Sequence, residues 1–141
     1  MRFSLVFASL MALGLGATPS FAAPEAYECD LSAGIGANQW VSPRYIFSFD
    51  RKTNVAAVTD RLAATFFDGR PAPARIKRET RNGGVVLVWE VNARSASGQN
   101  AKFRYSAIID GRTKRVNVSA NPLAYNNNFN GSGKCTQLVV N

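Results

Sequence analysis

Carboxylates are the only side chains here with an obvious capacity for acid–base catalysis, because the 141-residue sequence contains no histidine. Without imidazole the chain cannot form a Ser-His-Asp or Cys-His arrangement or an ordinary zinc site with nitrogen ligands. No serine is followed by lysine three residues later, which excludes the Ser-x-x-Lys alternative. Two carboxylates can cleave a glycosidic bond without histidine. However, most Asp and Glu residues fall at expected turns or strand ends, so we expect a non-enzymatic protein without catalytic residues, cofactor or metal.

Basic residues give the chain a formal net charge of +8. Arg75 and Lys77 alternate along one expected strand, and Lys102 and Arg104 along another, so each pair shares a strand face. If the two strands are neighbours, the four cations form one basic sheet face. Such a face either protects a solvated sheet from aggregation or binds an anionic partner. The second interpretation makes these four residues the candidate anion-binding site.

The first 22 residues have the pattern of a secretory signal peptide. Arg2 precedes an apolar run over residues 3–17, and Ser20 and Ala22 occupy the small-residue positions of a cleavage site. The run is shorter than the roughly 20 residues of a membrane-spanning helix, so we expect no integral membrane protein. The sequence therefore predicts a signal peptide over residues 1–22 and one secreted domain over residues 23–141, in the bacterial periplasm. Anionic envelope components or periplasmic proteins are the expected partners there, and nucleic acid is not.

The two cysteines, Cys29 and Cys135, lie near the two ends of the predicted secreted domain. In an exported protein, two cysteines without a third predict a disulfide. Chain-entropy arguments assign a loop of about 100 residues close to 4.7 kcal/mol of stabilisation. We therefore expect a bond that joins the ends of the domain.

Alternation of apolar and polar residues predicts strands along most of the remaining chain. The expected strands cover residues 27–31, 44–49, 55–60, 74–79, 85–91, 101–109, 114–119 and 136–140. Asn82 and Gly83 predict a hairpin turn with positive φ. These features predict an all-β domain, a small antiparallel barrel or sandwich of seven to eight strands closed by the N- to C-terminal disulfide.

Three segments do not follow this alternation. Residues 61–68 fit either a strand or a single helical turn, and residues 121–134 are expected to form the longest loop. Trp40, Tyr125 and Phe129 lie in expected loops. They can plug an end of a barrel or contact a sugar or a protein, and we favour plugging.

The segment Ser95-Ala96-Ser97-Gly98, followed by Phe103-Arg104-Tyr105, resembles the serine-glycine loop of the periplasmic inhibitors of C-type lysozyme. The resemblance implies a small disulfide-bearing β-barrel and an inhibitory loop formed by residues 95–99, with Ser95, Ser97 and Gly98 as its candidate residues. The later Phe-Trp element of that family has no counterpart in this sequence. An inhibitor of a cationic lysozyme should also be acidic, whereas this chain is basic. Inhibition is therefore the alternative to anion binding.

Overall fold

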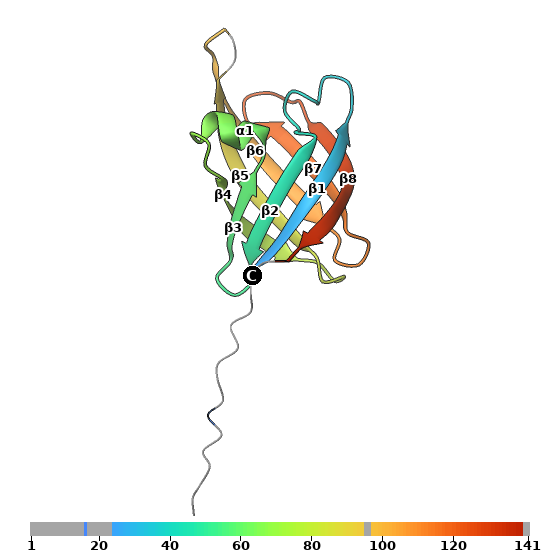
Figure 1. The fold of residues 1–141 in the computed structure, drawn as a ribbon. Coiled ribbons are helices and arrows are strands. Elements are labelled where there is room, and N and C mark those ends of the chain that lie inside the picture. Colours follow the sequence, from blue (N-terminus) through green and yellow to red (C-terminus); the bar gives the residue numbers. More distant parts are fainter. Residues whose placement is uncertain (1–15, 17–23, 95–96, 140–141) are drawn as a thin grey trace, which may run out of the picture.

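The computed structural model describes residues 16, 24–94 and 97–139, and within them the chain forms eight strands and one helix. The strands are β1 (Glu25–Ala33), β2 (Arg44–Asp50), β3 (Val55–Thr59), β4 (Ala72–Glu79), β5 (Val85–Arg94), β6 (Asn100–Ile109), β7 (Arg115–Pro122) and β8 (Phe129–Leu138). The helix is α1 (Arg61–Phe66), between β3 and β4 (Figure 1). The predicted signal peptide lies outside the described residues, apart from Gly16, and stays a prediction.

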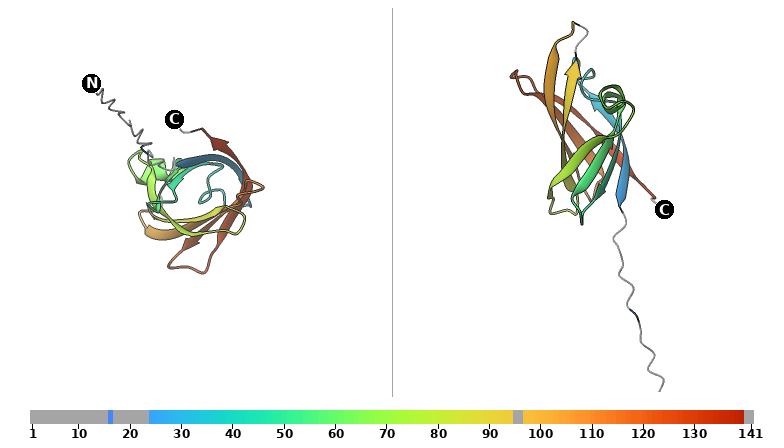
Figure 2. Two further views of the ribbon diagram at one scale, coloured as in Figure 1. Left: turned by 90° about the horizontal axis from the view of Figure 1, so that it is seen from below. Right: turned by 90° about the vertical axis from the view of Figure 1, so that its left-hand side faces the viewer.

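The eight strands form a closed antiparallel barrel in which each strand pairs with its neighbours in sequence. Viewed along the axis, the strands make a ring (Figure 2). The ring closes where β1 pairs with β8 from Ala26 opposite Leu138 to Ala33 opposite Gly131. The all-β prediction is confirmed, and the alternatives of barrel and sandwich are decided in favour of a barrel. A closed barrel leaves no free sheet edge.

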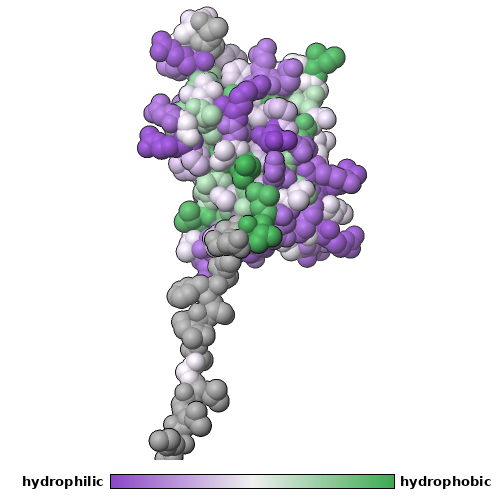
Figure 3. Space-filling view, in the orientation of Figure 1, coloured by the Kyte–Doolittle hydropathy of each residue, from purple (hydrophilic) through white to green (hydrophobic). Residues whose placement is uncertain are grey.

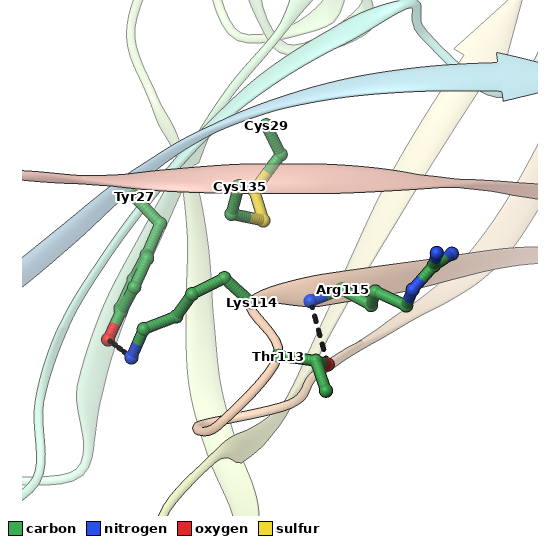
Figure 4. Close-up of a disulfide and its surroundings, with 6 residues drawn as sticks. All are labelled: Tyr27, Cys29, Thr113, Lys114, Arg115 and Cys135. Carbon is green, nitrogen blue, oxygen red and sulfur yellow. Dashed lines mark hydrogen bonds between the residues drawn. A yellow bond between two sulfur atoms is a disulfide. The ribbon is translucent and has the colours of Figure 1, made fainter.

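The predicted disulfide between Cys29 and Cys135 is present at the seam, where the two residues lie directly opposite one another. The turn between β6 and β7 packs beside this bond (Figure 4). Cys135 N donates a 2.8 Å hydrogen bond to Lys114 O, and Lys114 Nζ lies 5.3 Å from the centre of the Tyr27 ring. The disulfide therefore joins β1 and β8 at a point where the β6–β7 turn also contacts β8.

Aromatic side chains fill the inside of the barrel, as the alternation of the strands predicts. Trp89 is 5% exposed, and its ring stacks on Tyr105 at 5.2 Å between ring centres and meets Tyr45 and Phe47 edge-on at 6.2 and 5.9 Å. Burial raises the pKa of both Tyr45 and Tyr105. Tyr45 and Tyr105 are almost fully buried, so the rings and their neutral hydroxyls belong to one packed core.

One end of the barrel is covered by residues 34–43 and by α1. Val41 and Ser42 are 1% exposed, and Ser42 Oγ donates a 2.6 Å hydrogen bond to Asp60 Oδ2. Asp60 also caps α1, because its Oδ1 accepts a hydrogen bond from Ala63 N at 2.9 Å. The ambiguous segment after residue 60 is therefore helical, and one carboxylate fixes both the helix and the covering loop.

The predicted loop over residues 121–134 is shorter than expected: β7 continues to Pro122 and β8 begins at Phe129, so only residues 123–128 connect the two strands. The early part of β8 is rich in Gly, Ser and Asn, which have low strand propensity. Close packing against β1 explains why glycine is nevertheless used there. A Cβ atom at Gly133 would lie 1.8 Å from the backbone oxygen of Asp30.

Polar residues cover most of the barrel face drawn in Figure 3, with a smaller hydrophobic group toward its lower end. Within the described part of the chain, no helix is long and apolar enough to cross a membrane.

Candidate functional site: a basic groove on the outer face of β4–β6

A groove of about 590 Å³ lies on the outer face of β4, β5 and β6. Its lining consists of Pro73, Ala74, Arg75, Lys77, Val88, Trp89, Glu90 and Arg104. The structure thus brings three of the four predicted anion-binding residues to one groove. The two basic strands are not direct neighbours, because β5 lies between them.

Strand register explains how these cations reach the same groove. Arg75 on β4 is opposite Val88 on β5, and Glu90 on β5 is opposite Arg104 on β6. The half-buried Val88 therefore lies in the floor of the groove, with Arg75 on one side. A β-bulge between β4 and β5 makes Lys77 an extra residue between two regular pairs.

The fourth predicted residue, Lys102, lies beside the groove rather than in its lining. Lys102 Nζ is 3.1 Å from Glu90 Oε2, and Arg104 Nη2 is 3.6 Å from Glu90 Oε1. The hydrogen bond from Lys102, together with the nearby Arg104 charge, holds the pKa of the Glu90 carboxyl below its ordinary value. Glu90 is therefore an anion that partly neutralises the basic groove.

Arg75 and Lys77 differ from Lys102 and Arg104 in their ion pairing within the described part of the chain. Among the described residues, no acidic side chain lies within ion-pair distance of either of them. The groove consequently holds an excess of positive charge on its β4 side above an apolar floor. It can accept a phosphate or carboxylate group, with the attached apolar part of the ligand on Val88 and Pro73.

The described residues of the candidate inhibitory loop, Ser97, Gly98 and Gln99, lie between β5 and β6. The β5–β6 hairpin extends beyond the other connections at its end of the barrel (Figure 1). Gly98 adopts φ of 82°, a conformation that suits glycine, and Ser97 is exposed. Ser95 lies outside the described residues.

Carboxylates are scattered in the described part of the chain, where no group of three or more Asp, Glu or Cys residues could hold a metal ion. Most of the acids instead pair with arginine or lysine on the surface. Arg51 is an example, since its guanidinium contacts Glu25 at 2.6 Å and Glu79 at 3.0 Å.

Sequence reasoning identified the cations of the groove but not Glu90 as their central partner. Glu90 lies two residues after Val88 in β5, so the alternation of the strand places both on the outer face. This alternation was the sequence signal from which the position of Glu90 could have been predicted. The pairing with Lys102 and Arg104 depends on the β5–β6 register, which the pattern of one strand does not reveal.

Comparisons with protein-family models, curated proteins and solved structures found no match to this chain.

Proposed function

We propose that the protein is a secreted, non-enzymatic binding protein that attaches to anionic lipid headgroups of the bacterial envelope through the basic groove. The observation that carries this proposal is the positive charge of Arg75 and Lys77, which pair with no acid among the described residues, beside a groove with an apolar floor. Each Lys or Arg near an anionic lipid surface contributes about 1 kcal/mol. Four cations around one acid are therefore sufficient for weak, reversible attachment.

A lipid surface fits the groove better than a soluble anion does. The groove is open on the convex outside of the barrel, where a flat array of headgroups can approach it. The side chains of Lys and Arg can extend their charged ends toward phosphates while their stems cover apolar surface. Attachment of this kind weakens as salt rises, because exposed charges are screened over about 10 Å at 0.1 M salt.

Sedimentation with vesicles tests the proposal. The protein comprising residues 23–141 should bind vesicles of phosphatidylglycerol but not vesicles of phosphatidylcholine. Added salt should release it from the vesicles. The quadruple variant Arg75→Gln, Lys77→Gln, Lys102→Gln and Arg104→Gln should lose this binding at least 100-fold. Unchanged binding by a folded quadruple variant would refute the proposal.

A matched pair of double variants separates the groove from net charge. Arg75→Gln with Lys77→Gln removes two cations from the groove, whereas Arg115→Gln with Lys134→Gln removes two from the paired strands β7 and β8. We expect a loss of about tenfold or more for the first variant and a smaller loss for the second. Equal losses would mean that only the total charge matters. Inhibition of binding by free glycerol phosphate would indicate that a soluble anion is the ligand.

The protruding β5–β6 hairpin supports a second candidate function, inhibition of a C-type lysozyme. The resemblance of residues 95–98 implies that Ser95, Ser97 and Gly98 are the residues that enter the cleft of the enzyme. The rate at which lysozyme clears a suspension of bacterial cell walls would measure inhibition directly. No effect of equimolar protein on that rate would eliminate this candidate.

A further inference from the structure

A second cleft, of about 280 Å³, opens at the end of the barrel where the loop after β1 meets the connection between β7 and β8. Four aromatic residues line it, namely Trp40, Phe103, Tyr125 and Phe129, together with three residues that carry amide side chains, Gln99, Asn100 and Asn127. None of the lining residues is charged. The cleft is therefore chemically different from the basic groove, and it does not enter the proposed attachment to lipid.

Trp40 forms a fixed wall of this cleft. Its ring stacks on Phe103 with 4.3 Å between ring centres and 26° between the planes, and its backbone oxygen accepts a 2.7 Å hydrogen bond from Tyr105 Oη. Because Tyr105 belongs to the packed core, its hydrogen bond fixes the backbone of Trp40 relative to the barrel. Trp40 and Phe129 are partly buried against the core, which agrees with the predicted plugging role, but both also border an open cleft.

The predicted plugging role is wrong for Tyr125, which does not belong to the core. Its side chain is 61% exposed, and it lies on the connection between β7 and β8. An exposed aromatic ring beside a cleft offers a large contact area at a small cost in conformational entropy, as tyrosines do in binding surfaces. Together with Trp40 it gives the cleft a fixed ring and an accessible ring.

The volume and the lining limit the ligand to one small ring. Small-molecule sites begin at about 300 Å³, so this cleft fits a single ring rather than a long chain. The absence of charge in the lining disfavours an ionic ligand, and the amides can both donate and accept hydrogen bonds. A hexopyranose ring matches these properties, because it combines an apolar C–H face with hydroxyl groups around its edge.

We propose that this aromatic cleft binds one ring of a neutral glycan, with a sugar face against the aromatic side chains and its hydroxyls toward Asn100 and Asn127. The neighbouring rings of the glycan lie outside the cleft. The binding is independent of the basic groove and does not depend on salt.

Tryptophan fluorescence provides a direct measurement, because the chain has two tryptophans and they lie in different places. Trp40 borders the cleft, whereas Trp89 is buried in the core. Cellotriose or the N-acetylated form of chitotriose, both uncharged, should cause a saturable change in fluorescence with a millimolar dissociation constant. Trp40→Phe preserves an aromatic ring and should abolish most of this change, because Trp89 then remains as the only reporter.

A second variant measures binding without altering the reporter. Tyr125→Ala should weaken sugar binding at least fivefold, measured by calorimetry as well as by fluorescence. Leu123→Ala is the matched control, since this exposed residue lies on the same connection and outside the cleft lining. Equal affinity of the Tyr125→Ala protein and the unaltered protein would overturn the proposal.

Two further outcomes are decisive. Failure of both sugars to bind would also overturn the proposal. If N-acetyltryptophanamide binds and neither sugar does, the cleft is instead a site for a peptide side chain. The quadruple Gln variant of the basic groove should bind the sugars as the unaltered protein does. Failure of lipid attachment and failure of sugar binding are therefore separate results.

Discussion

Glu90 Oε2 lies 3.1 Å from Lys102 Nζ across β5 and β6, while Glu90 Oε1 lies 3.6 Å from Arg104. The single acid of the basic groove thus holds two of its four nearby cations. All three side chains are about half exposed, so the pairs themselves contribute little to stability. Their importance lies in the competition between Glu90 and an incoming anion for the same donors.

Glu90→Gln is therefore expected to strengthen binding to phosphatidylglycerol vesicles. The substitution removes a negative charge from the groove and leaves Lys102 and Arg104 available to lipid phosphates. We expect roughly threefold to tenfold tighter binding, in line with about 1 kcal/mol per charge at a lipid surface. Vesicle sedimentation at a fixed low salt concentration measures the difference.

Glu28→Gln is the control, because Glu28 is a partly exposed acid on β1 that pairs with Arg44 at 3.4 Å. It changes net charge by the same amount away from the groove. If both substitutions tighten binding equally, the effect belongs to total charge and the central role of Glu90 is wrong.

Removal of the disulfide should destabilise the barrel without changing its strand order. Cys29→Ala with Cys135→Ala deletes the covalent bond at the β1–β8 seam, which closes a loop with a sequence separation of 106. We expect the free energy of unfolding to fall by about 2–4 kcal/mol. Urea unfolding of the double variant, with and without a reducing agent, measures this loss. If the reducing agent lowers the free energy of unfolding of the unaltered protein but not that of the variant, the loss is due to the disulfide.

Gly133→Ala should destabilise the same seam through a steric effect. An added Cβ would approach the backbone oxygen of Asp30 at 1.8 Å, so β1 and β8 must separate locally. We expect a loss of about 1–3 kcal/mol, as for other overpacked sites. Gly34→Ala is the control, because nothing lies within 4 Å of the Cβ that it would add. Similar thermal stability of the two variants would contradict the close approach at Gly133.

Asp110 should make the protein sensitive to acid. Its Oδ1 accepts hydrogen bonds from the backbone nitrogens of Arg112 and Thr113 at 2.8 Å each, and its Oδ2 accepts one from Asn82. These bonds lower the pKa of the carboxyl from its ordinary value of 3.8 to about 2. Since the folded state has the lower pKa, the stabilisation is complete above the unfolded value and is lost as pH falls toward 2.

Asp110→Asn is accordingly expected to unfold more easily than the unaltered protein at neutral pH, with the difference shrinking between pH 3.8 and about 2. Urea midpoints at several pH values measure this convergence. A difference that stays constant down to the lowest pH would show that the charge of Asp110 is not responsible.

Most strands were predictable from sequence because their buried and exposed residues alternate. In β6, for example, Phe103, Tyr105 and Ala107 point into the barrel, whereas Lys102 and Arg104 point outward. The turn after β4 was also predictable, since Gly83 adopts the expected positive φ of 74°. Local patterns are sufficient where one face of a strand is apolar and the other is polar.

The C-terminal strand was only partly predictable. Gly131 and Gly133 in β8 give no apolar alternation, and the strand exists because close packing against β1 accommodates them. The basic groove was likewise only partly predictable from the sequence. The sequence places Arg75 and Lys77 on one face of a strand, but the position of β5 between the basic strands arises from the order of the whole sheet.

The pairing of Ala26 with Leu138 brings the first and last strands side by side, so the ring of strands has no structural beginning. A circularly permuted chain, with a short linker joining residues 26 and 138 and new ends at a hairpin turn, would keep every pair of neighbouring strands. The barrel should therefore form with its chain ends at a different hairpin turn.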